Sequence, residues 1–142
     1  MKKIGYSIFI VVLVAAACKP SNKINKVVGI TKATFENTKW ALTELDAQAI
    51  TFENKPYLMF APKSMVVNGF GGCNQLAGSY ESSGQKLKLN NMAATRMFCQ
   101  ETMQTENAFL QTLQQVNHYR IEGHQLMLLQ DDKVVARLRV AN

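Results

Sequence analysis

The feature that most constrains the fold is a regular alternation of side chains near the carboxyl end of the chain. Leu126 and Leu128 share one face of an extended segment, whereas Met127 and Leu129 share the other. After a tight turn at Asp131–Asp132, every second residue is apolar, namely Val134, Ala136, Leu138 and Val140. A period of two does not fit an amphipathic helix. The pattern predicts a β-hairpin with one buried face and one mixed face.

Apolar segments earlier in the chain predict further strands, separated by turn residues. These strands are expected within Trp40–Leu45, Tyr57–Ala61, Ser64–Phe70, Gly78–Glu81, Leu87–Leu89 and Ala93–Phe98. Between residues 101 and 117 the spacing changes to that of a helix with one apolar stripe. The stripe consists of Met103, Phe109, Leu110, Leu113 and Val116. His118 and His124 flank a turn expected after the helix. The sequence therefore predicts an α+β domain with antiparallel strands and one amphipathic helix.

The net charge of the chain is concentrated in its first part. The 142 residues carry a formal net charge of +6, but six lysines precede Glu36, which is the first acidic residue. From Thr34 onward, ten basic residues balance ten acidic ones. A domain that binds nucleic acid carries positive charge on its own surface. The distribution therefore argues against a nucleic-acid partner.

The first 17 residues have the layout of a secretory signal peptide. Two lysines precede the apolar run Ile4–Ala17, whose 14 residues are fewer than the roughly 20 that a membrane-spanning helix needs. The stretch Leu13–Cys18 resembles a bacterial lipobox, in which the cysteine is lipidated and becomes the first residue. We therefore expect a lipoprotein signal peptide at 1–17, and a lipidated cysteine with a flexible basic tether at 18–33. The alternative is an ordinary signal peptide with an incidental Cys18.

Cys73 and Cys99 form an even pair in a domain that we expect to be exported, and such pairs usually oxidise. A bridge between them would stabilise the fold by roughly 3–4 kcal/mol on the chain-entropy account. Two buried thiols are one alternative. A redox pair usually has the spacing C-x-x-C, which is absent. A metal site would need both cysteines to meet His118 and His124 without the paired cysteines of zinc modules. We therefore expect a structural disulfide and no metal.

Three short motifs follow one another along the domain. They are G-x-G-G-C-N-x-x-x-G-x-Y from Gly69 to Tyr80, T-x-M-x-C from Thr95 to Cys99, and E-x-x-F-L-x-x-L from Glu106 to Leu113. With Trp40-x-Leu42 before them and Leu126-x-Leu128 after them, this order resembles the META/HslJ-like family of small bacterial envelope proteins over residues 34–142. The resemblance implies a small mixed domain with a curved, largely antiparallel, barrel-like sheet and one packed helix.

Asn74, Arg96 and Glu106 are the motif residues to which a binding role is open. We expect Asn74 to hydrogen-bond the loop backbone, with a ligand contact as the alternative. For Glu106, three roles stay open: capping its helix, pairing with Arg96, or simple solvation. The glycines of the first motif favour a tight corner or a close backbone approach. A phosphate-binding P-loop would need G-K-[ST], which is absent. Three aromatic residues are expected in the core: Trp40, Tyr80 and Phe109.

Members of the family often occur as single-domain lipoproteins and have been linked to heat shock and antibiotic tolerance, and the resemblance supplies no catalytic residue. We expect a non-catalytic, monomeric envelope protein that needs no cofactor. It would be anchored to membrane lipid through Cys18 and would be a stress- or tolerance-related binding module for an unidentified protein or small molecule. In some lipoproteins an Asp after the cysteine marks inner-membrane retention. Lys19 stands there, which favours the outer membrane, facing the periplasm. The alternatives are a carrier of a small hydrophobic ligand in a barrel-like cavity and an inhibitor of a cell-wall lytic enzyme.

Overall fold

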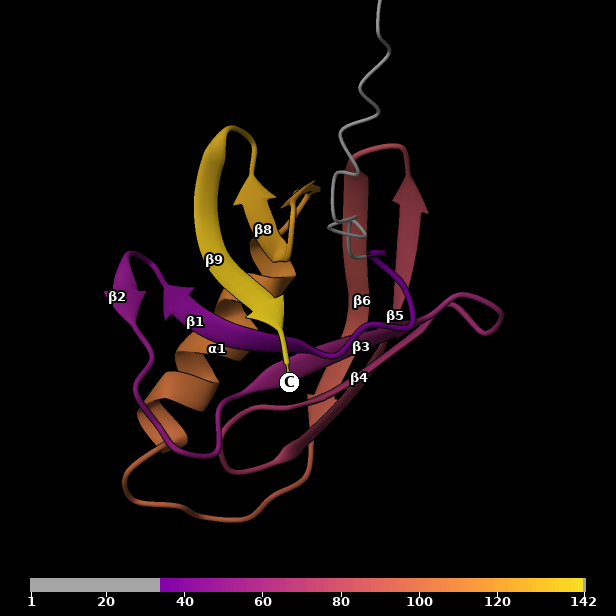
Figure 1. The fold of residues 1–142 in the computed structure, drawn as a ribbon. Coiled ribbons are helices and arrows are strands. Elements are labelled where there is room, and N and C mark those ends of the chain that lie inside the picture. Colours follow the sequence, from indigo (N-terminus) through magenta and orange to yellow (C-terminus); the bar gives the residue numbers. More distant parts are fainter. Residues whose placement is uncertain (1–33, 142) are drawn as a thin grey trace, which may run out of the picture.

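The computed structural model describes residues 34–141, which form nine strands and one helix (Figure 1). The strands are β1 (Trp40–Leu45), β2 (Gln48–Ala49), β3 (Tyr57–Ala61), β4 (Val66–Phe70), β5 (Gln75–Ser83), β6 (Lys86–Ala94), β7 (His118–Glu122), β8 (Gln125–Gln130) and β9 (Lys133–Val140). The helix α1 (Met103–Gln115) lies between β6 and β7 in the chain. Within the described residues, no helix is long and apolar enough to cross a membrane. The expected signal peptide, the lipidated Cys18 and the tether lie outside the described residues.

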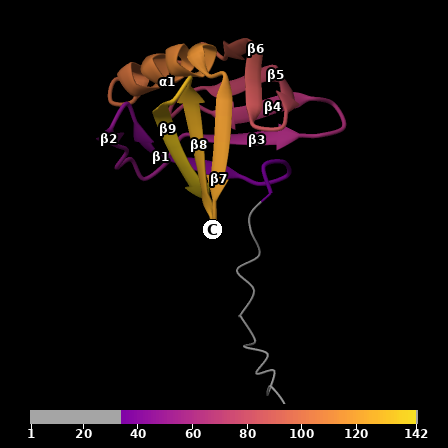
Figure 2. The ribbon, with the colours of Figure 1, turned by 90° about the horizontal axis from the view of Figure 1, so that it is seen from above.

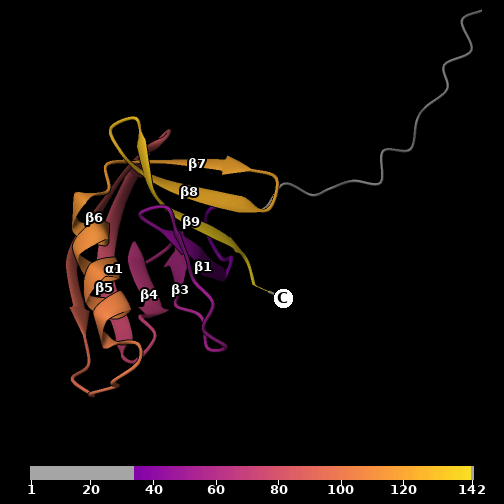
Figure 3. The same ribbon diagram turned by 90° about the vertical axis from the view of Figure 1, so that its left-hand side faces the viewer.

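Neighbouring strands pair antiparallel, and the sheet closes into a ring because β1 pairs with β9 as well as with β3. The pairing is narrowest between β6 and β7, where Lys86 is opposite His118. The connection between these two strands contains α1, which packs against β6 at the side of the ring (Figure 2 and Figure 3). The predicted α+β class with a barrel-like, largely antiparallel sheet is therefore confirmed.

Large side chains fill the interior of the ring. Trp40, Phe60, Tyr80 and Phe109 are each at most 1% exposed and belong to one core cluster. The three aromatic residues expected in the core are among them. Because Phe109 comes from α1 and the others come from strands, the helix and the sheet share one core. Burial of each such side chain contributes about 1.5–3 kcal/mol.

A bulge in β1 explains why Trp40, Leu42 and Leu45 are all buried although their spacing breaks strict alternation. The pairing of β1 with β9 shifts register around Thr43, which adds one residue on the β1 side. The Thr43 hydroxyl donates to the carbonyl oxygen of Arg137 at 3.0 Å. The extra residue returns Leu45 to the core.

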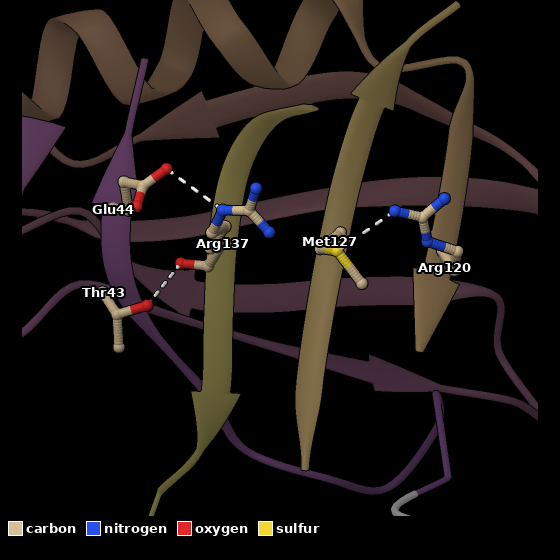
Figure 4. Close-up of polar contacts among 5 residues, drawn as sticks. All are labelled: Thr43, Glu44, Arg120, Met127 and Arg137. Atoms are coloured by element: carbon tan, nitrogen blue, oxygen red, sulfur yellow. Dashed lines mark hydrogen bonds and ion pairs between the residues drawn. The ribbon is translucent and has the colours of Figure 1, made fainter. Parts of the chain in front are cut away.

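The predicted hairpin of β8 and β9 is present, with its turn at Asp131–Asp132. Its second face is more covered than expected, because Met127 is 1% exposed. Arg120 of β7 and Arg137 of β9 lie on either side of Met127 (Figure 4). Arg120 Nη2 is 3.6 Å from the sulfur of Met127, and Arg137 Nε donates to Glu44 at 3.1 Å. The aliphatic stems of arginines cover apolar surface while their charged ends stay in water.

The alternation of β9 shifts near its start. Leu128 is opposite Ala136, whereas Leu129 is opposite Val134, so the register slips between the two pairs. Val135, which the pattern places on the mixed face, is therefore 2% exposed, while Val134 is half-buried. The hairpin was predicted correctly, but this local register was not.

The prediction of a strand over Ala93–Phe98 is wrong. Strand β6 ends at Ala94, and residues 95–100 form a loop. The chain stays beside β5 for one more residue, where the Thr95 N–H donates to the carbonyl of Gln75 at 3.1 Å. It then leaves the sheet because the following backbone bonds to a side chain instead of a neighbouring strand.

The region between His118 and His124 is not a simple turn, as the sequence suggested, but contains the strand β7. This strand pairs with β8, and Gly123 forms the turn with φ +58°. Only Tyr119 and Ile121 of β7 pack against the core, and both are partly buried. Two apolar residues are too few to reveal the strand from its alternation.

The first described residues close one end of the ring. Phe35 is stacked between Phe60 and Tyr119, with ring centroids 4.2 Å and 4.3 Å away. The hydroxyl of Tyr80 donates to the Glu36 carboxylate at 2.8 Å. Burial, and after it this bond to Glu36, raises the pKa of Tyr80 above its usual range. Burial likewise raises the pKa of Tyr119.

Candidate functional site

A buried carboxylate from α1 organises the loop that carries the glycine-rich motif. This loop connects β4 to β5, and Glu106 of α1 is only 2% exposed beneath it. The backbone N–H groups of Cys73 and Asn74 donate to Glu106 Oε2 at 3.0 Å and 2.6 Å. The Asn74 side-chain amide donates to Glu106 Oε1 at 2.6 Å. Three hydrogen bonds to one charged group make this cluster a strong link between helix and loop.

Two glycines make the close approach possible. A Cβ on Gly71 would lie 2.5 Å from the Cγ of Glu106, so a larger residue would displace the carboxylate. Gly72 has φ +113°, a conformation that side chains rarely permit. The Gly72 carbonyl also accepts a hydrogen bond from the Thr102 hydroxyl at 3.0 Å, just before the helix. The close approach predicted for these glycines is therefore present.

Asn74 links the same loop to residues 95–99. Its Oδ1 accepts from the Met97 N–H at 2.7 Å and from the Thr95 hydroxyl at 2.8 Å. Its Nδ2 also donates to the Met97 carbonyl at 3.1 Å. The backbone hydrogen bonds expected of Asn74 are thus present, and the side chain is 2% exposed. Asn74 positions the second loop as firmly as the first.

None of the three roles considered for Glu106 matches the structure. It does not cap its own helix, because its oxygens bind the β4–β5 loop. It is buried and therefore not a solvated side chain. Arg96 is exposed and is not its partner. Glu106 is buried because it lies on the same face of α1 as Phe109 and Leu113, and this face packs inward.

The predicted disulfide between Cys73 and Cys99 is present, with a Cα–Cα distance of 5.8 Å. It joins the same two loops that Asn74 joins. Both sulfurs are used in this bond, so they do not meet the histidines in a metal site. His118 Nδ1 instead lies 2.9 Å from Asn117 Oδ1. The disulfide and the polar cluster together hold residues 95–99 in place.

The loop that they hold presents two large apolar side chains to solvent. Phe98 is 81% exposed and Met97 is 57% exposed. Single exposed apolar residues are common, but these two are adjacent and lie on a segment fixed by a disulfide and by Asn74. Because this segment was expected to be a strand, the exposed pair was not predicted. The two neighbouring apolar letters before Cys99 were the available signal.

An open groove of about 1040 Å³ lies on the outer face of the sheet, over β9, β1, β3, β4 and the start of β5. Its lining includes three exposed cations, Lys39, Lys55 and Arg139, and one carboxylate, that of Glu53. None of the three cations belongs to an ion pair formed within residues 34–141. The groove was not foreseen, because its residues come from five strands and from the loops beside them.

Aromatic rings line the same groove. Lys39 Nζ lies 4.1 Å from the centroid of the Tyr57 ring, a cation–π contact. The ring of Phe70 lies 6.3 Å from that of Tyr57. Positive charge beside flat apolar rings can bind a ligand that carries both anionic groups and apolar faces. The molecule therefore has three distinct features: a saturated polar cluster, an exposed apolar loop and a basic aromatic groove.

Comparisons with known proteins agree with this architecture. A family model described as the META domain matches residues 33–142. The NMR structure of a protein from Burkholderia xenovorans is 23% identical, with a TM-score of 0.62, and the match covers 76% of this chain and 84% of that one. A second NMR structure is 22% identical, with a TM-score of 0.60 and coverage of 75% and 91%.

A third solved structure with a similar fold is the crystal structure of a DUF4847 family protein from Bacteroides vulgatus ATCC 8482. It is 13% identical, with a TM-score of 0.57, and the match covers 76% of this chain and 94% of that one. At these identities the three structures share the fold with this chain and carry no argument about a ligand. A search of curated proteins returned no match.

Proposed function

This chain belongs to the META domain family, and on that premise we propose that it is a non-catalytic, lipid-anchored binding module of the bacterial cell envelope. One observation carries the non-catalytic part: Cys73, Asn74 and Glu106, the polar groups of the motif, are all bonded to one another or to loop backbone. The Glu106 carboxylate has its oxygens occupied by three donors, and a sulfur in a disulfide is not a free nucleophile. The motif therefore stabilises the fold, and a ligand would bind to exposed surfaces elsewhere on the domain.

The anchor rests on the amino-terminal sequence. Cys18 follows the small residues of an apolar run, and acyl chains on it would each contribute about 0.8 kcal/mol per buried CH2, which makes several chains a durable anchor. A flexible segment of about 15 residues would let the domain move by roughly 20 Å from the bilayer. With Lys19 after the cysteine, the proposed site is the outer membrane, facing the periplasm. As a monomer there, the protein would serve stress or antibiotic tolerance, as its family implies.

Metabolic labelling with a radioactive fatty acid tests the anchor. The wild-type chain should carry label and fractionate with membranes. The variant Cys18→Ser should carry none and should become soluble or stay unprocessed. The double variant Cys73→Ser/Cys99→Ser is the matched control, because it removes two sulfurs and should keep the label. Equal labelling of the Cys18→Ser chain would refute the proposal.

Inhibition of a cell-wall lytic enzyme is a second candidate, which the exposed Met97–Phe98 pair favours. A rigid loop that enters a cleft loses little entropy on binding. The chain enters the domain beside the β5–β6 turn, since Thr34 lies near Ser82 and Gly84. Residues 95–99 follow the opposite end of β6. The loop therefore points away from the proposed anchor, where a soluble enzyme can reach it.

Assays of lysozyme activity on peptidoglycan test this candidate. If the full chain inhibits, Phe98→Ala should weaken inhibition by roughly tenfold or more, as expected for an anchor residue. Met59→Ala removes another exposed apolar side chain, 41% exposed on β3, and should change little. Absence of inhibition by the wild-type chain, or equal effects of both substitutions, would remove the candidate.

The structure offers less support for a carrier of a hydrophobic ligand. The interior positions where such a ligand would lie are taken by Trp40, Phe60 and Tyr80, each at most 1% exposed. Native mass spectrometry of the purified chain would reveal a retained apolar molecule. A stoichiometric adduct would revive this function, and a mass equal to that of the lipidated chain would dismiss it.

A further inference from the structure

We propose that the groove over β9, β1, β3, β4 and the start of β5 binds an extended, acidic carbohydrate chain. This inference rests on the proposed function as a binding module, and it names the surface and the class of ligand. The groove follows one continuous row of side chains, which the register of the sheet defines. Successive pairings connect these outward residues in the order Arg139, Ala41, Tyr57, Phe70 and Gln75.

The row suits an extended ligand. Its members alternate with buried neighbours such as Leu138, Leu42 and Leu58, so they point out of the ring. Five strands spaced about 4.8 Å apart give the row a length of roughly 19 Å. The spacing between strands is similar to the length of one pyranose residue. Ala41 is the smallest member and lies within the row, which leaves room above the sheet for a chain to lie across it.

The chemistry along the row fits acidic sugars. Arg139 at one end, with Lys39 and Lys55 beside it, provides three cations against the single carboxylate of Glu53. Arginine and lysine bind carboxylate or phosphate oxygens by charge-assisted hydrogen bonds. Tyr57 adds an aromatic ring to the row, and Lys39 Nζ lies 4.1 Å from its centroid, so a cation and an apolar surface lie side by side.

Neutral polar groups complete the lining. Thr43, Asn54 and Gln75 also border the groove. The amide groups of Asn54 and Gln75 both donate and accept. The Thr43 hydroxyl, which donates to the Arg137 carbonyl, can still accept from a sugar hydroxyl. A small enclosed metabolite fits less well, because the groove is open and its volume of about 1040 Å³ slightly exceeds the usual range for such ligands.

Two other polymers fit the surface less well. An acidic peptide commonly binds by adding a strand to a free sheet edge, but β1 in the groove floor pairs with β9 on one side and with β3 on the other. A single-stranded nucleic acid also uses cations and aromatic rings. It usually requires a strongly positive domain, whereas residues from Thr34 onward have equal numbers of basic and acidic side chains.

The test uses the full chain in an uncharged polyoxyethylene detergent and three probes. These are hexagalacturonate, its methyl ester, and a single-stranded hexadeoxynucleotide. The ester keeps the sugar chain and removes its charges. We expect hexagalacturonate to bind by isothermal titration, with affinity that falls as salt is added. The ester should bind at least tenfold more weakly, and the oligonucleotide should bind more weakly than hexagalacturonate.

Variants then locate the site. Arg139→Gln should weaken binding of hexagalacturonate about tenfold, as expected for a lost charge-assisted hydrogen bond. Lys63→Gln removes an exposed lysine outside the groove and is the matched control. Tyr57→Leu should weaken binding, whereas Tyr57→Phe keeps the ring and should retain it. Thermal unfolding of each variant shows whether its domain remains folded.

Several results would overturn the inference. They are no binding of hexagalacturonate, equal binding of its methyl ester, tighter binding of the oligonucleotide, or equal effects of Arg139→Gln and Lys63→Gln. The anchor is tested separately by the lipid label on Cys18. A chain that carries the lipid label but does not bind hexagalacturonate refutes only the proposal for the groove. A chain that lacks the label but binds hexagalacturonate refutes only the proposed anchor.

Discussion

The buried Glu106 allows the sharpest test of how the motif stabilises the domain. Glu106→Gln keeps the size of the side chain, removes its charge and replaces one acceptor oxygen with a donor. If the new amide nitrogen faces Asn74 Nδ2, two donors oppose each other. If it faces the backbone, the N–H groups of Cys73 and Asn74 lose their shared acceptor. Either orientation loses at least one charge-assisted hydrogen bond, worth about 1.5–3 kcal/mol, and weakens the others.

We therefore expect Glu106→Gln to lower the free energy of unfolding by about 2–4 kcal/mol. Urea unfolding of the full chain can be followed by the fluorescence of Trp40, the single tryptophan, which is buried in the core. The midpoint should fall with an unchanged m-value. Glu101→Gln, an exposed carboxylate close to the start of α1, is the control and should shift stability by less than about 0.5 kcal/mol. A midpoint for Glu106→Gln equal to that of the control would refute the reasoning.

Three further predictions concern the disulfide and the aromatic end of the ring. The variant Cys73→Ala/Cys99→Ala should lose about 3.5 kcal/mol of unfolding free energy relative to the oxidised wild-type chain, since the bridge spans 26 residues. Compared with the wild-type chain in reductant, the variant should be almost equally stable. A difference that persists in reductant would show that lost packing, and not the bridge, is responsible. Phe35→Ala should lower the free energy of unfolding in urea by about 3–5 kcal/mol, because Phe35 is 8% exposed and its side chain lies between two aromatic neighbours. A loss below about 1 kcal/mol would mean that the segment around Phe35 adds little to the stability of the sheet. For Tyr80, the pKa is raised in the folded state, so the fold favours the protonated phenol. The stability it contributes is present below about pH 10 and is lost as pH rises further. Unfolding free energies at about pH 9 and about pH 11 should therefore differ more for wild type than for Tyr80→Phe, and equal differences would contradict the assignment to Tyr80.

Most of the fold was predictable, because local patterns and tertiary contacts point the same way in most elements. The hairpin ending at Val140 has an apolar face that alternates in the sequence, and the strand Tyr57–Ala61 is a short apolar run closed by Pro62. The helix Met103–Gln115 lies within the range that its apolar stripe predicted. The strand β7 was missed because its apolar residues are few. The register shifts at Thr43 and after Leu128 were missed because a bulge depends on the partner strand.

The candidate site was less predictable, because its parts come from distant segments. The disulfide followed from counting cysteines in a domain that the amino-terminal sequence led us to expect to be exported. The role of Glu106 did not, because a charged residue on a helix is usually solvated and its three donors come from residues more than 30 positions away. The signal was the place of Glu106 on the same stripe as Phe109 and Leu113. A charge on a buried stripe implies donors opposite, and the Gly71 position opposite it admits that carboxylate.

The polar cluster also connects the two surfaces for which binding is proposed. Asn74 binds Glu106 on one side and Met97 of the exposed loop on the other. The next residue, Gln75, is the last member of the groove row, and its N–H donates to the Thr95 hydroxyl at 3.2 Å. Weakening the hydrogen bonds of Glu106 should therefore make both the exposed loop and the Gln75 end of the groove less ordered. Arg139 lies at the other end of the row. A Glu106→Gln chain that kept full affinity for hexagalacturonate would place the binding energy at the Arg139 end.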